Sequence, residues 1–129
     1  MNKNVFILLL IFVLPILCYF YVSKTNKSTV SVASTGTPQL IKFTSNMCAE
    51  CKRVEPVVQN VMVKYQDKVH YISIPVQVSN KYNEDMMAKY NITLVPTIII
   101  LDKNQKLVKR IEGYVSESTL DGYLRNLCK

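Results

Sequence analysis

Charged residues are scarce in this sequence, and so are the side chains that usually build metal centres. Only 19% of the 129 residues are charged, whereas 49% are hydrophobic. This balance excludes a disordered acidic or basic tail protein, because such chains are poor in apolar residues. The chain also holds only four cysteines and one histidine. Four cysteines argue against a small scaffold held together by several disulfides, and a single histidine leaves few ligands for zinc.

Two binding motifs are also missing from the sequence. No glycine-rich loop that could cradle phosphates occurs among the three glycines, so we expect no bound nucleotide or flavin cofactor. No run of basic residues alternates with aromatic ones, although the formal net charge is +7. A nucleic-acid partner is therefore not expected.

The apolar residues are concentrated near the amino terminus. From Val5 to Val22 the sequence runs for 18 residues without a charge. A helix of that length measures about 27 Å, close to the roughly 30 Å hydrocarbon core of a bilayer. Small residues suited to signal cleavage do not follow the run directly. We therefore expect residues 1–22 to be an uncleaved signal anchor that spans the membrane once, with a cleaved secretory signal and a secreted or periplasmic product as the alternative.

The rest of the chain divides into a linker and one domain. Residues 23–38 are rich in Ser and Thr and lack apolar periodicity, which predicts a flexible tether with a possible short edge strand at Thr29–Ala33. Residues 39–129 are enough for one domain with a small hydrophobic core. We expect the protein to be monomeric. Basic residues are nearly balanced across the apolar run. The distribution of basic residues therefore does not decide the orientation. We expect the domain to lie on the extracytoplasmic side, because short amino-terminal anchors generally leave the amino terminus inside and export the rest of the chain.

Hydrophobic periodicity predicts the order of elements in residues 39–129. Four segments have the character of strands and three the character of amphipathic helices. The strands are Gln39–Thr44, Val69–Val76, Thr97–Leu101 and Leu107–Ile111, and the helices are Cys48–Tyr65, Tyr82–Tyr90 and Ser116–Cys128. This β-α-β-α-β-β-α order predicts an α/β fold in which helices cover both faces of a central sheet.

The sharpest motif is a C-x-x-C formed by Cys48 and Cys51 at the predicted start of a helix. Unpaired N–H groups and the helix dipole favour a thiolate at that position. Cys48 should be exposed at the helix tip and attack a disulfide, whereas Cys51, one turn further in, can resolve the mixed disulfide. The alternatives are two buried thiols or half of a zinc site. For zinc, the other candidate ligands in the domain are His70 and Cys128, and we expect neither to bind a metal.

The sequence from Gln39 to Lys129 resembles the thioredoxin-like thiol–disulfide oxidoreductases. The residues that carry the resemblance are Phe43, the C-x-x-C pair, Lys52, Pro56, the segment Val95-Pro96-Thr97 and Gly113. The resemblance implies a three-layer α/β/α fold with a central mixed sheet. It also implies protein thiol or disulfide partners, an upstream electron donor, and no cofactor besides a redox-active Cys48–Cys51 disulfide.

The same resemblance assigns substrate-binding residues. Pro96 would be a cis proline packed against the cysteines, and Val95 would pair its main chain with an extended peptide. The alternative is an ordinary loop proline before a strand. Gly113 would lie beside the active site. Met47 stands where the family usually has a tryptophan, a residue this chain lacks, and its flexible apolar side chain would contact a partner.

Two charged residues depart from the family pattern, and we expect both to tune the cysteine thiols. Lys42 stands six residues before Cys48, where thioredoxins bury an acidic proton acceptor for the second cysteine. A buried Lys42 would act as a neutral base or stabilise a thiolate by its charge, or else its stem would reach solvent without a role. Glu50 would weaken the thiolate by repulsion, and it is a second candidate proton acceptor for Cys51.

Together these features predict a membrane-tethered thiol–disulfide oxidoreductase that reduces disulfides in protein partners. Two other functions remain open. In one, the two thiolates would pass copper(I) to an exported metalloprotein. In the other, the domain would bind peptides and carry out no redox chemistry.

Overall fold

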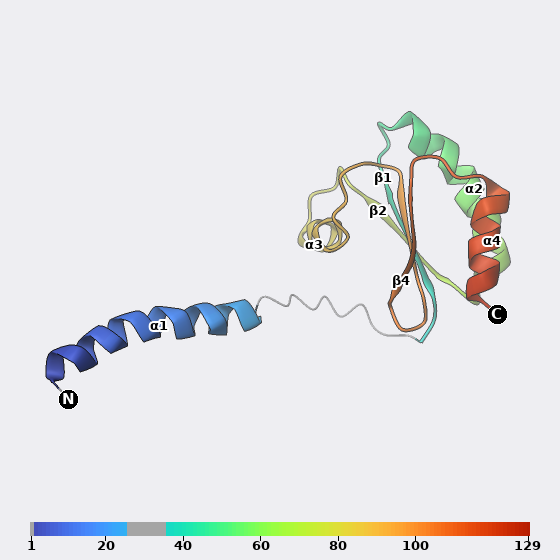
Figure 1. The fold of residues 1–129 in the computed structure, drawn as a ribbon. Helices are drawn as coiled ribbons and strands as arrows, with labels where there is room; N and C mark the ends of the chain where they lie inside the picture. The colour runs from blue at the N-terminus through green and yellow to red at the C-terminus, as the bar shows by residue number, and fades with distance from the viewer. Residues whose placement is uncertain (1, 26–35) are drawn as a thin grey trace. The chain divides into compact units, whose positions relative to one another are not determined.

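The computed structural model describes residues 2–25 and 36–129, and within these ranges the chain forms four helices and four strands (Figure 1). The chain divides into two units, residues 1–31 and residues 32–129. The first unit contains helix α1 (Lys3–Thr25), and the second contains the sheet and the other helices.

Helix α1 corrects one expectation from the sequence. The helix covers the apolar run as predicted, with Lys3 at its start, Lys24 near its end and Pro15 inside it. In the part of the chain that the structure describes, however, no helix is both long and apolar enough to cross a bilayer. The expected transmembrane anchor over residues 5–22, and with it the expected membrane partner, is therefore not supported.

The element order predicted for residues 39–129 is confirmed. The elements are β1 (Gln39–Thr44), α2 (Ala49–Tyr65), β2 (His70–Pro75), α3 (Lys81–Lys89), β3 (Thr97–Leu101), β4 (Leu107–Glu112) and α4 (Glu117–Leu127). Local capping explains where helices begin: Asn80 and Ser116 accept hydrogen bonds from the backbone amides three residues later, at the starts of α3 and α4. The edge strand suggested at Thr29–Ala33 lies outside the described residues.

The four strands form one mixed sheet in the order β2-β1-β3-β4. Strand β1 pairs in parallel with β2 and antiparallel with β3, and β3 pairs antiparallel with β4 in a hairpin. All five residues of β3 are buried, as its unbroken apolar sequence predicts for a strand covered on both faces.

Alternating residues of β1 point to two separate cores. Leu40 packs in a cluster with α2 and α4, whereas Ile41 and Phe43 pack in a second cluster with Met86 of α3. Figure 1 shows the same arrangement, with α2 and α4 on one side of the sheet and α3 on the other. Each fully buried aliphatic side chain contributes about 1.5–3 kcal/mol, so both layers contribute to the stability of the sheet.

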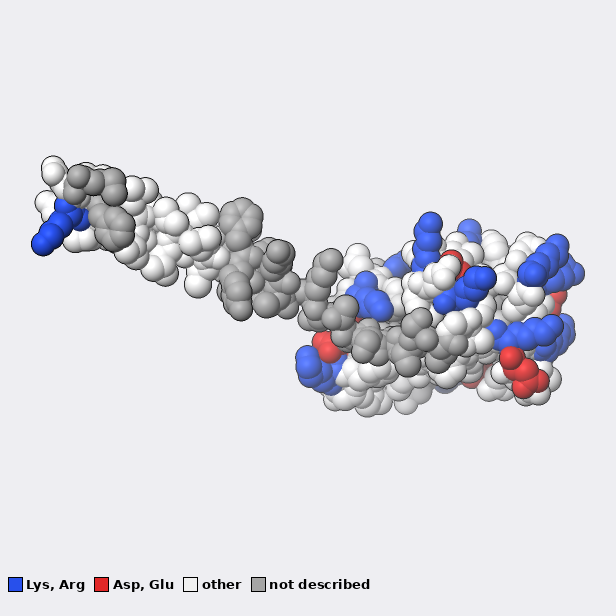
Figure 2. All heavy atoms as spheres, turned by 90° about the horizontal axis from the view of Figure 1, so that it is seen from below, with Lys and Arg blue, Asp and Glu red and all other residues white. Residues whose placement is uncertain are grey.

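The two ends of the sheet differ in character. At one end of the sheet, β1 ends and the chain continues into α2. β3 begins and β4 ends at this same end. At the opposite end, Gly36 and Lys129 line one pocket together with Lys68, Lys103 and Asp102. Figure 2 looks at the domain from that end, where Lys and Arg side chains cover more of the face than Asp and Glu.

Candidate functional site

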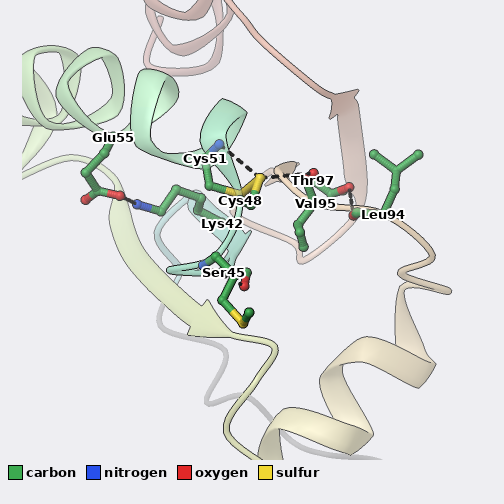
Figure 3. The surroundings of a disulfide bond; sticks show 9 residues. Lys42, Ser45, Cys48, Cys51, Glu55, Leu94, Val95 and Thr97 are labelled. Carbon is green, nitrogen blue, oxygen red and sulfur yellow. Dashed lines mark hydrogen bonds and ion pairs between the residues drawn. A yellow bond between two sulfur atoms is a disulfide. The ribbon is translucent and has the colours of Figure 1, made fainter.

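Cys48 caps the start of α2. Its side-chain sulfur accepts a hydrogen bond from the backbone amide of Cys51 at 3.1 Å, which satisfies one of the free N–H groups of the first helical turn. The amide of Cys48 donates to the carbonyl of Ser45 at 3.3 Å, which closes the loop after β1. Cys48 and Cys51 form a disulfide, with their Cα atoms 5.2 Å apart (Figure 3).

The two cysteines differ in access to solvent. Cys51 is 3% exposed, Cys48 is half-buried, and the neighbouring Met47 is 90% exposed. In the reduced protein, burial raises the pKa of the Cys51 thiol, and the adjacent Cys48 raises it further. A partner approaching this end of the domain therefore meets Met47 and Cys48 before Cys51, and the buried Cys51 must lose its proton inside the protein.

The loop before β3 lies against the cysteine pair. The Val95–Pro96 peptide bond is cis, as the resemblance implied, and Pro96 is buried. The sulfur of Cys48 lies 3.6 Å from the carbonyl oxygen of Val95. The Thr97 hydroxyl donates to the carbonyl of Leu94 at 2.8 Å and holds the loop together. These contacts place the main chain of Val95 next to the more accessible cysteine.

Gly113 joins the same site from the end of β4. Its amide donates a 2.8 Å hydrogen bond to the carbonyl oxygen of Pro96. The structure thus brings together the cysteines, Val95, Pro96 and Gly113, all of which the sequence placed at one site. Met47 stands at the exposed edge of this group.

Lys42 is buried, and the charged form predominates. Its side chain is 1% exposed and forms an ion pair with Glu55 of α2, whose side chain is 41% exposed. The ammonium nitrogen also lies 5.6 Å from the centre of the Tyr71 ring. Burial by itself lowers the pKa of Lys42, but Glu55 and Tyr71 raise it, and the net direction is upward. Of the sequence alternatives, a stem that reaches solvent is therefore wrong, and a neutral lysine base is disfavoured.

Glu50 pairs with a residue of its own helix. Its carboxylate accepts a 2.9 Å hydrogen bond from Arg53 one turn along α2, and the Arg53 and Glu50 side chains are 63% and 46% exposed. Arg53 in turn lies over the Tyr114 ring, 5.0 Å from its centre. Such an exposed pair contributes less than about 1 kcal/mol.

Glu55 is the site residue that the sequence analysis missed. A local signal was present, because Glu55 follows Cys51 by four residues and therefore lies on the same face of the helix. Its partner Lys42 comes from a strand 13 residues earlier, so their ion pair appears only in the folded chain.

Neither His70 nor Cys128 joins the cysteine pair. His70 is exposed and begins β2 opposite Gln39, at the far end of the sheet. Cys128 is a free, half-buried thiol that lines the pocket at that same far end. Within residues 2–25 and 36–129, no three His, Cys, Asp or Glu side chains gather as a metal site would require.

Comparison with known proteins identifies relatives of this domain. A family model described as a thioredoxin-like domain matches residues 25–127. Thioredoxin 1 of Nostoc sp. is 30% identical over 89 residues, which cover 69% of this chain and 78% of that protein. Mitochondrial thioredoxin of Bos taurus is 27% identical over 96 residues, covering 74% of this chain and 55% of that protein.

Solved structures with the same fold are also known. Thioredoxin-2, described as a component of the malaria parasite protein secretion machinery, superposes with a TM-score of 0.62 at 21% identity. The match covers 70% of this chain and 82% of that one. At this level of identity the likeness concerns the fold, which is the expected three-layer arrangement with a mixed four-stranded sheet.

Proposed function

This chain belongs to the thioredoxin-like domain family, and on that basis we propose that it reduces disulfide bonds in protein partners. Its distant thioredoxin homologues and its own C-x-x-C disulfide support thiol–disulfide oxidoreductase activity. The observation that carries the proposal is the unequal exposure of the two cysteines, with Cys48 half-buried beside the Val95 carbonyl and Cys51 almost fully buried.

The reaction begins with the dithiol form. The Cys48 thiolate attacks one sulfur of the partner's disulfide, that bond breaks, and the first partner thiolate leaves. Cys51 then attacks the sulfur of Cys48, which breaks the mixed disulfide and releases the second partner thiolate. Two electrons pass to the partner, and Cys48 and Cys51 end as a disulfide. An upstream two-electron thiol donor must restore the dithiol form.

The loop before β3 and the residues around it orient the partner in this proposal. An extended peptide pairs with the main chain of Val95, as a strand adds to a sheet edge. Such pairing lays the partner's cysteine across Pro96 toward Cys48. Met47 supplies a flexible apolar contact, and Gly113, without a side chain, leaves space beside the loop.

Electron flow toward the partner is proposed from the chain's relatives. A strong oxidant of this chemistry owes its potential to a stabilised reduced form. In the reduced protein, burial raises the pKa of Cys51, so Cys51 supplies no stabilised thiolate. The relatives named above are thioredoxins, and this likeness supports the reducing direction.

Trapping of mixed disulfides tests the proposal. Cys18 and Cys128 are first replaced by Ser, so that Cys48 and Cys51 are the reactive thiols. In that background, Cys51→Ser should hold partner proteins covalently through Cys48, and Cys48→Ser should hold none. The parent should also speed the reduction of insulin by dithiothreitol. An empty trap together with no insulin reduction would overturn the proposal, and tight copper(I) binding by the dithiol form would replace it with metal transfer.

We further propose that the domain works outside the cytoplasm. The support is the uncharged run over residues 5–22, which has the composition of an export signal, and the Ser/Thr-rich segment that follows it. Protease added to intact cells, or to spheroplasts where an outer membrane would shield a periplasm, should reach the domain when this run is present. Deletion of residues 5–22 should leave the domain protected, and equal protection of both forms would contradict export.

A further inference from the structure

An open pocket of about 300 Å³ lies beside the cysteine pair. Its walls include Cys51 and Glu55 of α2, together with Thr44, Lys52 and Gln77. Cys51 is almost fully buried, yet it borders this pocket. The pocket is therefore a route by which the Cys51 proton can reach water.

Helix geometry places Glu55 beside Cys51. The two residues are four apart in α2, a spacing at which side chains of a helix are neighbours. One carboxylate oxygen of Glu55 accepts from the Lys42 ammonium, the other accepts a 3.0 Å hydrogen bond from the side-chain amide of Gln59, and the side chain is 41% exposed. Glu55 therefore lies between a buried charge and the surface of the helix, as a proton carrier between interior and water requires. Figure 3 shows the Lys42 side chain extending from the neighbourhood of the cysteines toward Glu55.

The other ionisable groups near Cys51 are less suited to accept its proton. Lys42 of β1 is charged and has no free lone pair, and Tyr71 of β2, which lies against the Lys42 ammonium, is not among the residues that line the pocket. Lys52 of α2 is a cation as well. Glu50 is bound to Arg53 on the exposed surface of the helix.

We infer that Glu55, held in place by Lys42, is the base that removes the Cys51 proton when the mixed disulfide is resolved. The proton leaves the Cys51 sulfur through water in the pocket and binds a carboxylate oxygen of Glu55. The resulting Cys51 thiolate attacks the sulfur of Cys48, the bond between Cys48 and the partner breaks, and the departing partner thiolate takes up a proton from Glu55 or solvent. The carboxylate is thus regenerated, and Lys42 acts as a positioning residue.

This inference rests on the proposed reduction of disulfides, and the test separates the two. Reduced protein, with Cys18 and Cys128 replaced by Ser, is mixed with glutathione disulfide. Acid quenching and mass spectrometry then follow the lifetime of the Cys48–glutathione adduct. If even the parent forms no adduct and no Cys48–Cys51 disulfide, the proposed function fails, and the inference fails with it.

Glu55→Gln is the decisive variant. We expect its adduct to persist about a hundredfold longer near neutral pH, a factor at the low end for a general base. The difference should shrink as the pH rises, because hydroxide then removes the Cys51 proton directly. Glu84→Gln, which removes an exposed carboxylate of α3 on the other face of the sheet, should keep the parent's lifetime.

Further variants guard against a merely structural effect. Lys42→Met/Glu55→Gln removes both charges, leaves no buried cation unpaired, and should stay as slow as Glu55→Gln. Glu55→Asp keeps a carboxylate and should recover part of the rate together with its pH dependence. A lifetime within twofold of the parent for Glu55→Gln, or a slowing by the same factor at every pH, would overturn the role of Glu55.

Discussion

The amide nitrogen of Gly113 donates a 2.8 Å hydrogen bond to the carbonyl oxygen of Pro96. This bond fastens the loop that contacts Cys48 to the end of β4. Gly113 adopts a φ of +81°, a region that residues with a side chain rarely occupy. No described atom lies within 4 Å of a Cβ built at this position. Replacement of Gly113 should therefore cost backbone strain rather than a steric clash.

Substitution of two glycines by alanine should have opposite effects on stability. Gly113→Ala should lower the free energy of unfolding by about 1 kcal/mol, because alanine is strained at positive φ. Gly122 lies inside α4 and also has space for a Cβ among the described atoms. Gly122→Ala should raise the free energy of unfolding by about 0.5–1 kcal/mol, because alanine favours a helix. Urea denaturation measures both, and equal changes in one direction would contradict this assignment.

The Lys42–Glu55 ion pair predicts an asymmetry between its two partners. Glu55→Gln leaves a fully buried ammonium without a counter-charge and should lower the free energy of unfolding by about 3 kcal/mol. Lys42→Met leaves a carboxylate that already reaches solvent, so we expect a loss of about 1 kcal/mol or less. Chemical denaturation at neutral pH compares the two. A larger loss for Lys42→Met than for Glu55→Gln would show that the ammonium is not buried as described.

Stability at high pH tests the ionisation of Lys42. Its pKa is raised in the folded state, so its contribution is complete below the ordinary lysine pKa of about 10.4 and is lost as the pH rises through the higher folded value. The difference in unfolding free energy between wild type and Lys42→Met should therefore stay constant from neutral pH to about pH 10 and shrink above it. A difference that already vanishes at lower pH would mean that the folded pKa is lowered.

Alkylation should distinguish the two cysteines. In the reduced protein, Cys51 is buried and its thiol pKa is raised, whereas Cys48 is accessible at the helix start. Iodoacetamide near pH 7.5 should therefore modify Cys48 at least about tenfold faster than Cys51, because the thiolate is the reacting species. Peptide mass spectrometry follows each cysteine separately. In urea-unfolded protein the two rates should become similar, which is the control for intrinsic reactivity.

Arg110 should be needed to hold the chain that enters the site loop. From β4, its guanidinium donates to the main-chain carbonyls of Tyr90 and Asn91 just after α3, and its Nε atom pairs with Glu112 at 2.7 Å. Arg110→Met should lower the free energy of unfolding by about 2 kcal/mol, because these hydrogen bonds come from a charged donor. Amide exchange in residues 89–95 should speed up as well. Lys109→Met, one residue earlier in β4, should leave that exchange unchanged.

The fold of residues 39–129 was predictable because its signals are local. The helical stripe that includes Val54, Val58 and Val61 is buried as its spacing predicts, and the unbroken run of β3 is the doubly covered strand. The cis state of Pro96 followed from resemblance, since an ordinary loop proline would have fitted the same residues. The membrane span was not supported, although the helix over that run formed as predicted.

The environment of Lys42 could not be settled from sequence. The sequence left three states open for the Lys42 side chain: a neutral base, a buried charge or an exposed stem. Which state occurs depends on the residues of α2 that contact Lys42 after the helix has packed on the sheet. The contacting residue is Glu55, whose side chain meets Lys42 only through the tertiary fold. Glu50, in contrast, pairs with Arg53 three residues later in the same helix, so this pair could be predicted from the local sequence.

The chain ends of the domain meet at the end of the sheet that is remote from Cys48. Because Gly36 and Lys129 line one pocket there, a short glycine linker should be able to join them. New termini could then be opened in the turn between β3 and β4, near Asn104, which is exposed. Such a circular permutant would keep every contact around the cysteine pair, and it would separate catalysis by the domain from any contribution of residues 1–35.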